Sequence, residues 1–101
     1  MPPYGFLVEF HTTPDRAAAL TQFLRDAKTL VDAEPGTLTW FAFRTGPTSF
    51  GVFDAFPTAE DRERHLHGEV RRAIVARAGE LFDRAPVITP VDVLAAKLPV
   101  G

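Results

Sequence analysis

Hydrophobic and polar positions alternate over the first dozen residues and then change their spacing. Phe6, Val8 and Phe10 fall on one side of segment 4–12, as expected for a strand with one buried face. Apolar residues then recur at three- and four-residue spacing, which predicts an amphipathic helix. We expect this helix to start with the hydroxyl of Thr13 as N-cap and to end before Glu34-Pro35-Gly36.

The second half of the chain predicts two strands, an interrupted helix and a final strand. Segment 38–56 reads as two strands joined by a turn at Gly46-Pro47-Thr48. Thr58 and Asp61 resemble a capping box, so a helix is predicted from about Ala59, with an interruption at Gly68 and a continuation to about Arg84. Residues 86–98 return to strand-like alternation, and Pro90 within them predicts an edge strand.

The resulting order is strand, helix, strand, strand, helix, strand. It predicts an α+β fold of the ferredoxin-like split βαβ type, with a four-stranded antiparallel sheet and helices on one face, in a single domain over residues 1–101. Segment 38–56 holds five of the nine phenylalanines and the only tryptophan, and both of its faces are apolar. Because the helices cover only one face, we expect a second copy to cover the other, forming a homodimeric α+β barrel.

Composition narrows the classes of function. The net charge is −2 and the arginines of the third quarter are interleaved with acidic residues, which argues against nucleic-acid binding. No apolar run approaches the roughly 20 residues of a membrane span, and the first residues do not resemble an export signal. The chain has no cysteine, which fits a reducing cytoplasm, and its preference for arginine over lysine suggests a bacterial source.

Two titratable residues stand out in apolar surroundings. Asp54 lies in a row with Phe50, Val52 and Phe56, where an unpaired carboxylate is costly, so it either pairs with a cation such as protonated His65 or borders a water-containing cleft. His65 is expected on the helix side that meets the sheet, where a neutral imidazole accepts a proton near pH 7. A buried histidine satisfied by a backbone group is the alternative.

Aromatic residues predict the rest of a small-molecule site. Phe50, Phe56 and Trp40 are candidates for stacking against a planar apolar ligand, and His11 and Arg44 for polar contacts to it, or for the rim of a dimer interface. His65 and His67 are two apart on a helix and cannot share a metal ion, so no metal is expected. Motifs for nucleotide cofactors and serine hydrolases are absent from the sequence.

Several of these segments together resemble the antibiotic biosynthesis monooxygenase domain family. The resemblance rests on Glu34-Pro35-Gly36 before the second strand, Asp54 and Phe56 at the end of the third, and His65-Leu66 on the next helix, and it spans almost the whole chain. It implies a dimeric α+β barrel and, for some members, oxygenation of aromatic polyketides by O2 without flavin, haem or metal. Phe56 stands where the family usually has tryptophan, and the chain has no asparagine, so haem degradation is disfavoured.

The hypothesis from the sequence is therefore a cofactor-independent monooxygenase that oxidises a small aromatic or polyketide-like substrate, with hydroxylated polycyclic aromatic molecules as the first to test. His65, assisted by Asp54, would deprotonate the ring hydroxyl, and the anion would react with O2. Two alternatives remain: a non-catalytic dimer that binds a small apolar metabolite, and an isomerase or dehydratase of the same fold. The ligand site lies either between the sheet and the helices or inside the dimer near Glu9, His11 and Arg44.

Overall fold

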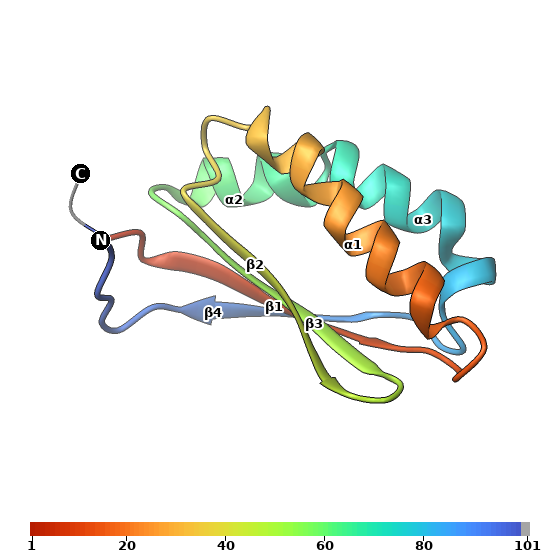
Figure 1. Ribbon diagram of the computed structural model, residues 1–101. Coiled ribbons are helices and arrows are strands. Elements are labelled where there is room, and N and C mark those ends of the chain that lie inside the picture. The colour runs from red at the N-terminus through yellow and green to blue at the C-terminus, as the bar shows by residue number, and fades with distance from the viewer. Residues whose placement is uncertain (100–101) are drawn as a thin grey trace.

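The protein forms a four-stranded antiparallel sheet with three helices packed on one face (Figure 1). A computed structural model describes residues 1–99. The elements, in chain order, are β1 (Tyr4–His11), α1 (Ala17–Asp32), β2 (Thr39–Gly46), β3 (Ser49–Phe56), α2 (Ala59–Leu66), α3 (Glu69–Leu81) and β4 (Val87–Asp92). The strands lie in the order β2-β3-β1-β4, which confirms the predicted split βαβ plan. None of the helices among residues 1–99 is both long and apolar enough to cross a bilayer.

The core lies between the sheet and the helices α1 and α3. Its largest members are buried aromatic and aliphatic side chains that alternate along the strands and recur along the helices: Phe10, Leu20, Phe23, Leu24, Phe50, Val52, Leu81 and Phe82. The rings of Phe10 and Phe82 stack with centroids 5.1 Å apart. The hydrophobic stripe of α1 and the inward face of the strands therefore bury each other.

Local signals predicted most element boundaries. The turn falls at Pro47 and Thr48, α2 begins at Ala59, and the Thr58 hydroxyl accepts a hydrogen bond of 3.1 Å from the backbone N–H of Asp61. β4 is an edge strand, as Pro90 indicated. Two helix ends were predicted wrongly, as was the length of β4: α1 begins at Ala17 rather than after Thr13, α3 ends at Leu81 rather than near Arg84, and β4 covers only residues 87–92.

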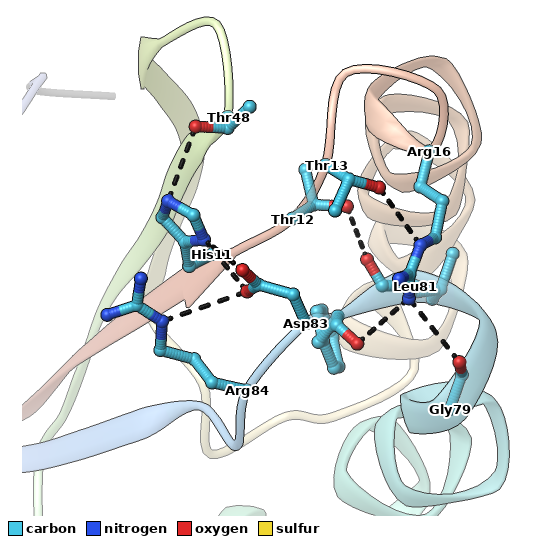
Figure 2. A network of polar contacts seen from close by, with 10 residues as sticks. His11, Thr12, Thr13, Arg16, Thr48, Gly79, Leu81, Asp83 and Arg84 are labelled. Atoms are coloured by element: carbon cyan, nitrogen blue, oxygen red, sulfur yellow. Dashed lines mark hydrogen bonds and ion pairs between the residues drawn. The ribbon is translucent and has the colours of Figure 1, made fainter.

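A polar network explains the late start of α1 (Figure 2). The Thr13 hydroxyl accepts a hydrogen bond from Nε of Arg16 at 3.0 Å instead of capping a backbone N–H. Nη1 of Arg16 donates to the carbonyl oxygen of Phe82 at 3.0 Å, and the buried Thr12 hydroxyl donates to that of Leu81 at 2.6 Å. The residues just before α1 are thus held by the end of α3, 66 or more residues away in the sequence. A local sequence pattern cannot predict such contacts.

Strand pairing assigns each side chain to one face of the sheet. Directly paired residues share a face, and Phe10 pairs with Phe50, which pairs in turn with Arg44. These three face the helices, together with Trp40 and Asp54. The opposite, open face carries Leu7, Glu9, His11, Phe41, Phe43, Phe53 and Val87. The prediction that His11 and Arg44 lie together in one polar cluster is therefore wrong. His11 pairs with Ser49 and Arg44 with Phe50, and adjacent residues of a strand point to opposite faces of the sheet.

Candidate functional site

A buried carboxylate lies where β3 passes beneath α2. Asp54 is only 1% exposed, and its Oδ2 lies 2.9 Å from Nε2 of His65, the second-last residue of α2. Its Oδ1 has no hydrogen-bond donor among residues 1–99. His65 is thus the cation partner that the sequence argument suggested for Asp54. The other carboxylate oxygen, Oδ1, can still accept a hydrogen bond.

His65 is bound on both sides of its ring. Nδ1 lies 2.5 Å from Oε1 of Glu34, in the connection between α1 and β2, and that oxygen also accepts a hydrogen bond of 2.7 Å from the Thr37 hydroxyl. The ring of Phe56 packs against the imidazole with centroids 5.1 Å apart. Two carboxylates and one aromatic ring therefore fix the position and orientation of His65.

The charges of Asp54 and Glu34 favour the protonated form of His65. Burial alone lowers the pKa of the imidazole, but hydrogen bonding to Asp54 and Glu34, and their negative charges, outweigh it, so the pKa of His65 is raised above its ordinary value of 6.5. With both ring nitrogens facing carboxylates, the favoured form is the imidazolium, which donates from Nδ1 and from Nε2. In this form His65 has no free lone pair with which to accept a proton.

A small cavity opens beside Asp54 and His65, between the sheet and the helices α2 and α3. Its volume is about 200 Å³. Apolar side chains form most of its wall, among them Phe6, Val8, Val70, Ile74, Pro86 and Ile88, and Arg71 is its one other charged residue. The cavity thus offers an apolar space with a carboxylate at one point of its wall, which suits a small ring that carries a hydroxyl group.

Three residues predicted to contact the same ligand lie elsewhere on the helix side of the sheet. Trp40, Arg44 and Phe50 line a separate groove of about 570 Å³ between α1 and β2. This groove and the cavity of Asp54 share no lining residue. Phe56 contacts His65 but is fully buried and does not line the cavity. It therefore packs against the histidine and does not contact a ligand directly.

His11 lies on the open face, near the end of β1 (Figure 2). Its Nδ1 is 2.8 and 2.9 Å from the two carboxylate oxygens of Asp83, and its Nε2 is 3.3 Å from the Thr48 hydroxyl. Hydrogen bonding to His11 lowers the pKa of Asp83 below its ordinary value. These contacts tie β1 to the segment after α3 and place His11 on the other side of the sheet from Asp54 and His65.

Sequence reasoning missed the role of Glu34. Glu34 was noted as part of the Glu-Pro-Gly segment that ends the first helix, but it stands 31 residues before His65, and no spacing rule relates the two. The signal that was available is the need of a buried imidazolium for a hydrogen-bond acceptor at each of its two N–H groups. Residues 1–99 contain no group of three or more histidine, cysteine or acidic side chains arranged to hold a metal ion.

Solved structures with this fold define the class of protein. A putative antibiotic biosynthesis monooxygenase from Deinococcus radiodurans matches with a TM-score of 0.80 and 20% identity, covering 97% of this chain and 99% of that one. Another from Caulobacter crescentus matches with a TM-score of 0.78 and 22% identity, covering 91% and 90%. The chain therefore has the fold of the antibiotic biosynthesis monooxygenase family, which confirms the resemblance seen in the sequence.

A more similar protein places the chain within a particular family. The NE2512 protein from Nitrosomonas europaea, a protein of unknown function, is 43% identical, with a TM-score of 0.94 over 98% of this chain and 96% of that one. The chain belongs to the same family as this protein. No family model matches the sequence. No curated protein matches it either.

Proposed function

We propose that this protein is a homodimeric, cofactor-independent monooxygenase that oxidises a small, electron-rich phenol with O2. The observation that carries the proposal is Asp54, which lines an apolar cavity and whose buried Oδ1 has no donor among residues 1–99. A ligand hydroxyl that donates to Oδ1 would offset the cost of its burial. The fold shared with proteins named as antibiotic biosynthesis monooxygenases supports the same class of reaction.

The geometry favours a division of roles that differs from the one expected from the sequence. Asp54 accepts the proton of the substrate hydroxyl at Oδ1. His65, held as imidazolium between Asp54 and Glu34, orients the carboxylate through Oδ2 and balances its charge. In this proposal His65 is a positioning residue.

The cavity volume limits the size of the substrate. An apolar cavity of about 150 Å³ accommodates benzene, and the cavity here measures about 200 Å³. One substituted ring, or two fused rings, therefore fits, whereas the polycyclic substrates expected from the sequence would require the helices to move. We accordingly propose monocyclic or bicyclic phenols as the substrate class.

The proposed reaction needs no external reductant, because the substrate supplies all four electrons that reduce O2. Loss of the hydroxyl proton to Asp54 gives a phenolate, whose electron-rich ring carbon transfers one electron to O2. The resulting radical and superoxide combine to form a C–O bond, and the peroxide takes the proton back from Asp54 to give a hydroperoxide. Cleavage of its O–O bond, with loss of the ring hydrogen as a proton, leaves a quinone and releases one water molecule. One oxygen atom enters the product and the other leaves as water.

The open face of the sheet supports the homodimer. Phe41 and Phe43 on this face are 59% and 38% exposed in the single chain, and Val87 is 54% exposed. Leu7 and Phe53 extend the same apolar surface across the central strands. A second copy would bury this surface, and His11, the last residue of β1, would lie at its edge.

Oxygen consumption with a panel of monocyclic and bicyclic phenols tests the proposal. We expect turnover by the wild type and its loss in Asp54→Asn, which keeps the shape of the side chain but removes the base. Asp26→Asn, the same substitution at an exposed position of α1, is the matched control and should retain turnover.

The alternatives predict different results. Binding of the same phenols without oxygen uptake would identify a binding protein and contradict the monooxygenase. Conversion without oxygen uptake would identify an isomerase or dehydratase.

A further inference from the structure

The groove between α1 and β2 is larger than the cavity of Asp54 and lies outside the proposed reaction site. It measures about 570 Å³ and lies where β2, at one edge of the sheet, is covered by α1 alone (Figure 1). Leu24, Trp40, Ala42 and Phe50 form its apolar wall. A planar apolar molecule can therefore lie along its floor without displacing core side chains.

The polar lining of this groove has one sign of charge. Arg25, Lys28 and Arg44 line it, and no carboxylate does. Lys28 forms an exposed ion pair with Asp32 at 2.6 Å, and Arg44 donates to the carbonyl oxygens of Gly46 and Pro47. Arg25 has no ion pair or side-chain hydrogen bond within residues 1–99. The groove therefore attracts an anion, and Arg25 is available to bind it.

The indole of Trp40 adds a donor to these cations. Its Nε1 is buried and finds no acceptor among the residues that the structure describes. Buried donors without acceptors are rare and costly in folded proteins. Because the indole lines this groove and not the cavity of Asp54, an oxygen atom of a ligand in the groove is a suitable partner.

We infer that this groove is a binding site for an aromatic carboxylate. The aromatic part lies along Leu24, Trp40 and Ala42, and the carboxylate accepts hydrogen bonds from Arg25 and from the indole N–H of Trp40. This inference is independent of the proposed reaction, since the two sites share no residue.

Titration of ¹⁵N-labelled protein with 2-naphthoate tests the site directly. Trp40 is the only tryptophan, so its indole N–H gives a single resonance that needs no assignment. We expect 2-naphthoate to shift this resonance. The neutral analogue with the same rings, 2-naphthalenemethanol, should have an affinity lower by about tenfold or more.

Charge-removal variants give the second arm. The double variant R25Q/K28Q should weaken 2-naphthoate binding about tenfold or more. The matched control R64Q/K97Q removes one arginine and one lysine from exposed positions outside the groove and should bind as the wild type does. The same spectra show whether each variant is folded.

Three results would overturn the inference. These are an indole resonance that does not respond to millimolar 2-naphthoate, equal affinity for the neutral alcohol, and equal affinity in R25Q/K28Q and R64Q/K97Q.

Discussion

Replacement of His65 by leucine should strongly destabilise the protein. Leucine is close to histidine in size and preserves the contact with Phe56, so the main loss is electrostatic. The variant leaves Asp54, 1% exposed, without the Nε2 that lies 2.9 Å from its Oδ2. Removing one partner of a buried ion pair typically costs about 3–5 kcal/mol. The loss of the contact between His65 and Glu34 adds less to this cost, because the side chain of Glu34 is 22% exposed and stays hydrated.

This cost is large for a domain of this size. Small domains are stable by about 5–15 kcal/mol, and each kcal/mol corresponds to roughly 4–8 °C in Tm. We therefore expect the free energy of unfolding of H65L to fall by about 3 kcal/mol or more. Urea unfolding followed by circular dichroism measures it, at one fixed protein concentration because dimerisation adds to apparent stability.

A double variant separates charge from packing. D54N/H65L removes the unpaired carboxylate along with its partner, so it should be more stable than H65L despite having one more substitution. If H65L loses less than about 1 kcal/mol and the double variant recovers nothing, the argument that His65 compensates the buried charge of Asp54 is refuted.

Three further predictions follow from the same structure. Because the pKa of His65 is raised in the folded protein, its stabilisation is complete below about pH 6.5 and lost as pH rises through the raised pKa. Urea unfolding across pH should show this decline in wild type but not in D54N/H65L, which lacks both the imidazole and its buried carboxylate partner. Thr58→Ala should lower the free energy of unfolding by about 1 kcal/mol while Thr58→Ser should not, and equal losses would contradict its role as N-cap. Phe41→Glu should give folded monomers by sedimentation velocity, whereas Ala18→Glu on the exposed side of α1 should not; a dimer that persists in F41E would place the interface elsewhere.

Local sequence signals predicted the fold because they act over a few residues. Alternation in β1 and the apolar stripe of α1 report which face each element buries, and Thr58 and Pro90 mark an end and an edge. The start of α1 was predicted wrongly because the side chain of Thr13 binds Arg16, which in turn binds the end of α3. That competition is tertiary, so a local pattern cannot reveal it.

The candidate site was predicted only in part for the same reason. Because an unpaired carboxylate is costly in an apolar row, the sequence offered a cation such as His65, or a water-containing cleft, as the partner of Asp54. Nothing local indicated that Glu34 binds the opposite nitrogen, since the connection between α1 and β2 reaches α2 only in the folded chain.

By itself, the sequence determined the order of the elements, their inward faces and the need of Asp54 for a cation, because periodicity and burial cost act on each segment separately. Only the tertiary structure decided how the candidate residues are grouped. Strand register places His11 on the open face and Arg44 beneath α1, and the packing of the helices leaves Trp40 and Phe50 in the wall of one hollow and Asp54 and His65 in the wall of another. Register and helix placement depend on contacts between segments far apart in the chain, which is why one predicted ligand site became two separate hollows.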